Sequence, residues 1–198
     1  MKIKLISFAF IFVGLTSVCF AQDYKDNIRQ RFDEFYKLTA AGKTEESLEY
    51  IPDTFFNIIP KTQMAAALKQ VMNNKDINYK ILDYKITEIA DSKNVDDNYY
   101  STLKYVSNLT MKFNDIDTIK NDGNKKARLN LIKLSLANTF GSDNVKLDET
   151  TGMYSITAHK KSCAVSKNGR TGWQFVNFES RQRLIMEKIL PKEIIESF

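Results

Sequence analysis

The sequence predicts an α+β fold, with N-terminal helices packed on a curved, mainly antiparallel sheet of about five strands, an inserted helix and a C-terminal helix. Apolar residues recur at helical spacing between residues 24 and 73. Apolar and polar residues then alternate over residues 99–113, which is typical of a long strand. Helical spacing returns at residues 125–140 and 181–198. Helices and strands segregated in this way favour α+β over an alternating βαβ fold.

The first 21 residues have the pattern of a cleaved secretory signal peptide. Lys2 and Lys4 precede an apolar run over residues 5–18, and small residues lead to a cleavage site between Ala21 and Gln22. We therefore expect an exported bacterial protein, periplasmic or extracellular. Its mature chain, residues 22–198, has a length typical of a single domain.

Two other interpretations of this segment are weaker. A membrane anchor needs roughly 20 apolar residues; this run is shorter, so we expect no stable anchor after cleavage. Lipid attachment at Cys19 would be favoured by a small residue before the cysteine. Here Val18 precedes it and the bulky Phe20 follows it.

The charge pattern argues against a nucleic-acid partner. The chain has 29 Lys and Arg residues and 24 Asp and Glu residues. Lys2 and Lys4 belong to the signal segment, which leaves 27 basic against 24 acidic residues. Nucleic-acid binders cluster their basic residues on one face. The basic runs at residues 125–128 and 160–161 are short and are flanked by polar residues, so we interpret them as solvent-exposed surface.

The first part of the mature chain is expected to be helical. Residues 24–41 form an amphipathic pattern that ends at Gly42, a natural C-terminal stop. Pro60 can occupy the first turn of a further helix that runs to about Asn73. Its apolar face carries Ala65 and Leu68.

The strands follow from period-two alternation and turn signals. In the segment 78–89 we expect Leu82, Tyr84 and Ile86 on one face and Ile81 on the other. Turns are predicted at residues 148–152 and at Asn168-Gly169, with strands after each.

The C-terminal segment, residues 181–198, has the apolar spacing of a helix, but it contains Pro191. Proline removes a backbone donor and clashes with the preceding turn, so either the helix breaks there or a second short helix begins there.

After signal cleavage, Cys163 is the remaining cysteine, so no intramolecular disulfide can form. His159 lies four residues away, which on a strand gives the same face but a separation of roughly 13 Å. We therefore expect Cys163 to be a buried structural thiol rather than a nucleophile, and His159 to point to solvent. One histidine and one cysteine also cannot build a usual zinc site.

No motif for cofactor or metal chemistry occurs in the chain. It has no glycine-rich phosphate loop, no Gly-x-Ser-x-Gly elbow, no His-Glu-x-x-His sequence and no calcium-loop spacing. Asp83 is expected on the face opposite Leu82 and Tyr84, so we find no carboxylate placed as an inner general base. We assign no catalytic, cofactor-binding or metal-binding residue.

Aromatic and hydroxyl side chains on the expected inner strand faces are the candidates for lining a pocket. Core packing is the alternative for each of them. The candidates are Tyr105, Ser107, Tyr154, Trp173 and Phe175.

The order of elements resembles the nuclear-transport-factor-two-like superfamily. The residues that carry the resemblance are the segments 144–152 (NVKLDETTG), 172–176 (GWQFV) and 189–195 (ILPKEII), which look like uncharacterised exported bacterial members. The resemblance implies a cone of helices against a curved sheet, with a pocket between them. It implies no particular reaction, because such folds host isomerases, dehydratases and binding proteins alike.

Our leading hypothesis is a non-catalytic module that binds a small apolar ligand in such a pocket, without a cofactor. One alternative is an acid/base enzyme of the isomerase or dehydratase kind. The other is a protein-binding partner, such as an immunity or envelope-assembly factor, that uses the outer face of the sheet.

Overall fold

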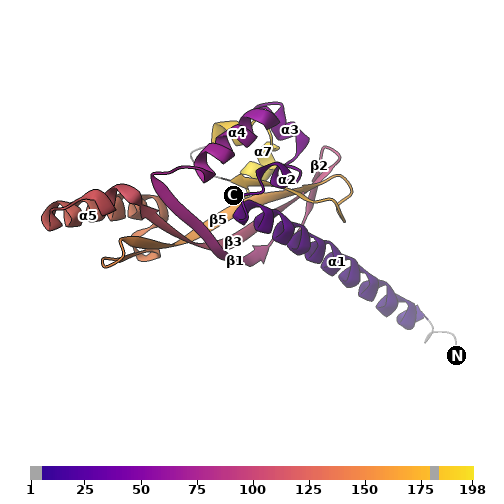
Figure 1. The fold of residues 1–198 in the computed structure, drawn as a ribbon. Helices are drawn as coiled ribbons and strands as arrows, with labels where there is room; N and C mark the ends of the chain where they lie inside the picture. The colour runs from indigo at the N-terminus through magenta and orange to yellow at the C-terminus, as the bar shows by residue number, and fades with distance from the viewer. Residues whose placement is uncertain (1–5, 179–182) are drawn as a thin grey trace.

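The computed structural model describes residues 6–178 and 183–198, with side chains from Asp23 onward. The predicted α+β class is confirmed: helices pack on a curved, antiparallel sheet of six strands (Figure 1). The sheet order is β1-β3-β5-β4, with β2 paired to β3 and β6 paired to β5. The strands are β1 (Ile77–Ile89), β2 (Lys93–Val95), β3 (Asn98–Phe113), β4 (Val145–Asp148), β5 (Met153–Ser166) and β6 (Gln174–Phe178).

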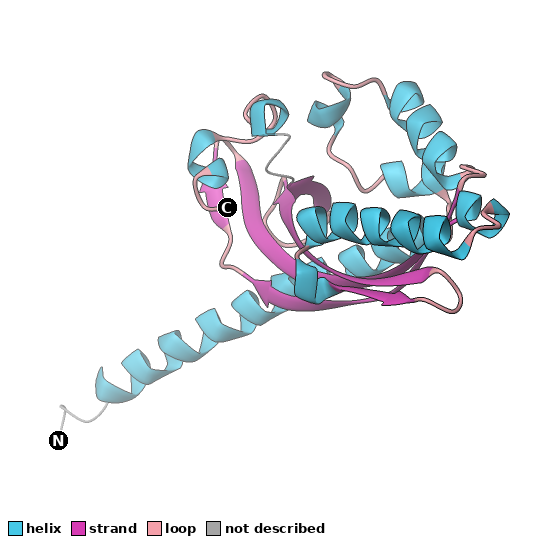
Figure 2. Ribbon diagram, turned by 90° about the vertical axis from the view of Figure 1, so that its left-hand side faces the viewer, coloured by secondary structure: helices cyan, strands magenta, loops and turns pink. Residues whose placement is uncertain are grey.

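The helices gather at different places around this sheet. Within the described residues the α-helices are α1 (Ile6–Ala40), α2 (Thr44–Leu48), α3 (Asp53–Phe56), α4 (Lys61–Met72), α5 (Asp122–Phe140), α6 (Arg183–Met186) and α7 (Lys192–Ile195). Helix α1 runs along the sheet, and α5 extends away from the other helices (Figure 1). Helices α2, α3 and α4 form one group, whereas the short C-terminal helices lie on the other side of the molecule in Figure 2. Among the helices that the structure describes, none is long and apolar enough to cross a membrane.

The expected signal peptide, residues 1–21, lies entirely outside the described side chains. The backbone from Ile6 onward is part of α1, but side chains are described only from Asp23. The described core residues of α1 begin with Tyr24 and Ile28, which lie after the expected cleavage site.

Helix α1 covers one half of the inner face of the sheet, the face that carries Leu103 and Tyr105. The predicted stripe of Ile28, Phe32 and Phe35 is buried against it. The ring of Phe32 lies 4.9 Å from that of Tyr105 and 5.0 Å from that of Phe175, both edge-to-face. Full burial of a side chain of this size contributes roughly 1.5–3 kcal/mol. This aromatic cluster therefore anchors α1 to the sheet.

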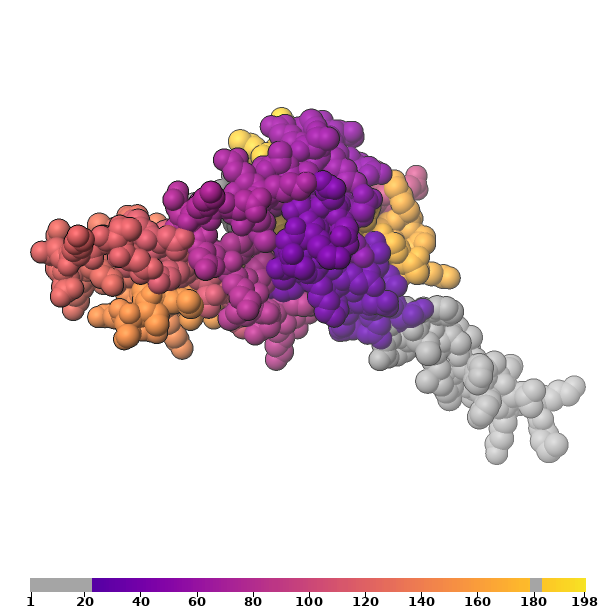
Figure 3. Space-filling model, in the orientation of Figure 1, coloured from indigo at the N-terminus to yellow at the C-terminus, as the bar shows by residue number. Residues whose placement is uncertain are grey.

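Helix α5 covers the other half of the inner face. Leu129 and Ile132 pack there with Tyr154 and Ile156 of β5. The Tyr154 hydroxyl donates to the carbonyl oxygen of Leu129 at 2.8 Å, and burial raises the pKa of Tyr154 to about 12. Figure 3 shows that the rest of α5 projects beyond the body of the molecule.

Short C-terminal helices cover part of the outer face. Cys163 and Val176 on that face pack against Met186 and Ile194. Pro191 is the residue before α7, so the expected C-terminal helix is two short helices separated at the proline. Residues 181 and 182 of the predicted helix lie outside the described residues.

One prediction about β1 is wrong. Ile81 pairs with Leu109, but the next pair joins Asp83 to Asn108, so a β-bulge inserts one extra residue at Leu82. The side chain of Leu82 is consequently 52% exposed instead of sharing the face of Tyr84. Ile81 and Tyr84 both lie on the inner face, because the bulge shifts the alternation by one residue.

Candidate functional site

A cavity of about 190 Å³ lies between the last turns of α1 and the inner face of the sheet. We call it the inner-face cavity. Its apolar wall is formed by Phe35, Ile81, Leu109 and Ala158. Period-two alternation brings these strand residues to one face, because partners in neighbouring antiparallel strands point the same way.

Hydroxyl groups meet at one wall of this cavity. The Tyr36 hydroxyl donates to the carbonyl oxygen of Asp83 at 3.0 Å and lies 2.6 Å from the Ser107 hydroxyl oxygen. Burial raises the pKa of Tyr36, which keeps the phenol neutral. If Tyr36 donates to the carbonyl, Ser107 donates to Tyr36 and keeps a lone pair that can accept a hydrogen bond.

A second polar group lies on the same cavity wall, toward β6. The Tyr105 hydroxyl donates to the side-chain oxygen of Asn177 at 3.3 Å. Lys160 also lines the cavity, with its ammonium 5.9 Å from the centre of the Phe140 ring. The cavity thus combines apolar side chains with a side-chain amide that can donate to a ligand oxygen.

The structure separates the five candidate pocket residues. Tyr105 and Ser107 line the inner-face cavity. Trp173 and Phe175 are fully buried in the core beneath α1, and Tyr154 is fully buried beneath α5. The backbone oxygens of Trp173 and Arg170 are also engaged, by the Arg31 side chain and by the Trp173 indole N–H. Trp173, Phe175 and Tyr154 therefore serve as core residues and do not line this cavity.

His159 and Cys163 lie on the outer face of β5, as predicted. His159 is exposed and pairs with Val106 of β3. Cys163 is free and fully buried, and burial raises the pKa of its thiol, which disfavours the reactive thiolate. Asp83 lies on the outer face too, where it accepts a 2.7 Å hydrogen bond from Asn108. The described residues contain no group of three or more His, Cys, Asp or Glu side chains that could hold a metal.

Sequence reasoning missed a larger cavity, of about 410 Å³, beside the loop that joins β5 to β6. We call it the hairpin cavity. It also contacts Asp53 at the start of α3 and Leu190 before α7. The Asn168-Gly169 turn was visible in the sequence, but nothing local indicates that α3 and the C-terminal segment pack beside it.

We compared the chain with models of protein families, with characterised proteins and with solved structures, and none of the three comparisons gave a match.

Proposed function

We propose that this protein is an exported, non-catalytic binding module that holds a small apolar ligand in the inner-face cavity. The observation that carries the proposal is the lining of that cavity, which combines apolar side chains with hydroxyl and amide groups. The resemblance to nuclear-transport-factor-two-like proteins supports the same location, between helices and a curved sheet.

The cavity volume limits the size of the ligand. A cavity of about 150 Å³ is enough to hold benzene, whereas drug-sized ligands occupy roughly 300–1,000 Å³. A volume of about 190 Å³ therefore suits a single ring or a short chain.

The polar groups of the lining indicate which substituent the ligand carries. Asn177 accepts from Tyr105 through its oxygen, which leaves amide N–H groups for a ligand acceptor. An ammonium group has no lone pair to accept from these N–H groups. We infer that the ligand bears an acceptor oxygen, such as a carboxylate, and that a cationic ligand is disfavoured.

The two alternative functions have less support. An acid/base isomerase needs a carboxylate or an imidazole near the substrate, and the described residues that line the inner-face cavity include neither. A partner protein on the outer face would need an apolar patch. Large exposed apolar side chains on the described strands are limited to Leu82 and Met153.

The test is NMR titration of the mature chain with benzoate, with cyclohexylamine as the cationic comparison. We expect benzoate to shift the amide signals of Ser107 and Ala158, and cyclohexylamine to leave them unchanged. Ala158→Leu places three extra carbon atoms in the cavity and should abolish the benzoate shifts. Ser107→Val is a second, milder block if Ala158→Leu fails to fold.

Ala127→Leu is the matched control, because Ala127 is exposed on α5 and the same change there leaves the cavity intact. The proposal is contradicted if benzoate shifts no inner-face signal, or if Ala158→Leu and Ser107→Val bind benzoate as the parent does.

A further inference from the structure

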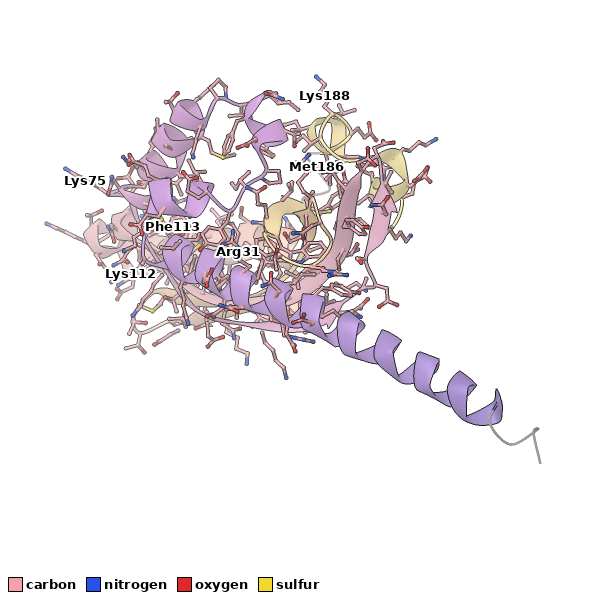
Figure 4. The ribbon with its side chains drawn as sticks, turned by 90° about the vertical axis from the view of Figure 1, so that its right-hand side faces the viewer. Arg31, Lys75, Lys112, Phe113, Met186 and Lys188 are labelled. Carbon is pink, nitrogen blue, oxygen red and sulfur yellow. The ribbon has the colours of Figure 1, made fainter. Side chains whose placement is uncertain are left out.

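The hairpin cavity is a second concave site, built from segments that are far apart in the sequence. Its volume of about 410 Å³ falls within the range of ligand-binding cavities. In Figure 4 the C-terminal segment directs Met186 toward the sheet, whereas Lys188 points away. The cavity walls include Asp53 and Thr54 of α3, Lys167 and Thr171 of the hairpin, and Ile189 and Leu190 before α7.

The floor of the cavity is apolar. Tyr100 of β3 and Val165 of β5 contribute to it from the outer face of the sheet, and Leu190 contributes from the C-terminal segment. Tyr100 and Leu190 belong to the same buried cluster, with Val165 packed against it. Burial raises the pKa of Tyr100, so its phenol stays neutral. An apolar ligand group placed on this floor would be removed from water.

Two opposite charges stand on different walls. Asp53 lies at the start of α3 and Lys167 lies at the start of the hairpin loop. Among the described residues neither side chain forms an ion pair, so their charged atoms are more than 4.0 Å apart. Both residues are exposed and line the cavity, so the carboxylate and the ammonium group are available to a ligand bound in it.

The two walls are held in fixed positions. Gln174 donates to the carbonyl oxygens of Glu49 at 3.2 Å and Ile51 at 3.1 Å, which ties β6 to the segment before α3. On the other wall, the Asn168 side-chain oxygen accepts from the backbone N–H of Thr171 at 2.9 Å. Binding to such a pre-organised site has a smaller entropic cost than binding to mobile loops.

We propose that the hairpin cavity binds a free α-amino acid with a large apolar side chain. Asp53 binds the ligand ammonium group, Lys167 binds its carboxylate, and the side chain covers the apolar floor. Charge-assisted hydrogen bonds of this kind are stronger than neutral ones and select for both charges at once. This site is separate from the inner-face cavity and does not depend on the function proposed there.

The test compares three related probes by isothermal titration: phenylalanine, N-acetylphenylalanine, which lacks the ammonium group, and phenethylamine, which lacks the carboxylate. We expect phenylalanine to bind on the order of tenfold more tightly than either analogue. Bound phenylalanine should shift the NMR signals of the Gly169 and Gly172 amides, which report on the hairpin wall.

Two variants assign the charges separately. Asp53→Asn should weaken the binding of phenylalanine and phenethylamine but not that of N-acetylphenylalanine. Lys167→Gln should weaken the binding of phenylalanine and N-acetylphenylalanine but not that of phenethylamine. The matched controls are Asp143→Asn and Lys146→Gln, at exposed positions outside the cavity. Neither should change the affinity for any of the three probes. Both test residues are exposed, so the variants are expected to fold.

The proposal is overturned if phenylalanine does not bind, if all three probes bind equally, or if neither variant changes the order of affinities. Phenylalanine shifts at Ser107 and Ala158 without shifts at Gly169 would also overturn it, because the inner-face cavity would then be the binding site.

Discussion

Cys163 is a residue whose behaviour is set by burial. Its side chain is fully buried on the outer face of β5, and burial raises the pKa of the thiol. Because the thiolate is the reactive species, we expect the folded protein to react with Ellman's reagent only as fast as it unfolds. In concentrated guanidinium chloride the same thiol should react at once.

His159→Cys is the matched control for this prediction, since residue 159 is exposed on the same face of the same strand. It should add one rapidly reacting thiol to the folded protein. Rapid reaction of the parent protein under native conditions would show that Cys163 is accessible, contrary to its packing against Met186 and Ile194.

Individual site residues could be predicted only where local periodicity determines their environment. Tyr105 and Ser107 were placed on the inner face from the alternation in β3, and they lie there. The same pattern placed Tyr154 correctly on that face, but it could not reveal that α5 covers this residue. Asp53 and Lys167 carry no periodic signal, because both come to line the hairpin cavity only through packing between separate segments.

Among the larger elements, the β5–β6 hairpin depends on two glycines in the left-handed region, Gly169 with φ +69° and Gly172 with φ +68°. A Cβ at Gly169 would lie 2.6 Å from Cδ1 of Tyr99, whereas a Cβ at Gly172 would meet nothing within 4 Å. Gly172→Ala should therefore cost only the backbone strain of roughly 1–2 kcal/mol. Gly169→Ala should cost clearly more, because the Tyr99 ring must also move.

Urea unfolding of the two variants measures this difference directly, and each serves as the control for the other. Equal losses in the free energy of unfolding would mean that Tyr99 moves aside without cost. A larger loss for Gly172→Ala would contradict the packing of the hairpin on Tyr99.

Element types were predicted more reliably than their details. The spacing in residues 24–41 and 99–113 identified α1 and β3. Over a long segment, the period of the apolar residues determines both the type of element and the face that is buried. The bulge at Leu82 could not be predicted, since an extra residue in one strand is specified by its pairing partner in β3. At Pro191 the sequence left two possibilities, and packing of Ile194 and Ile195 on the outer face accounts for the second short helix.

For the whole molecule, three separate clusters replace the single cone interior that the sequence suggested. One cluster lies beneath α1, one beneath α5, and one on the outer face beneath α6 and α7. The hydrophobic pattern indicated which residues are apolar, but the division among clusters depends on where each helix lies on the sheet. The inner-face cavity and the hairpin cavity consequently lie on opposite faces of the sheet, which is why neither volume could be read from the sequence.

The expected export of the protein concerns the whole chain and leads to the last prediction. When the full chain is produced in a bacterium with a secretion system, we expect the exported protein to have the intact mass of residues 22–198. The described core contacts of α1 begin at Tyr24, so cleavage before Gln22 removes none of them.

Ala21→Arg places a large charged residue at the cleavage site and should leave the chain uncut. Ala41→Arg, the same change at an exposed position beyond α1, should be cleaved normally. A mass increase that corresponds to lipid on Cys19, or retention of residues 1–21 in the exported parent protein, would contradict the prediction.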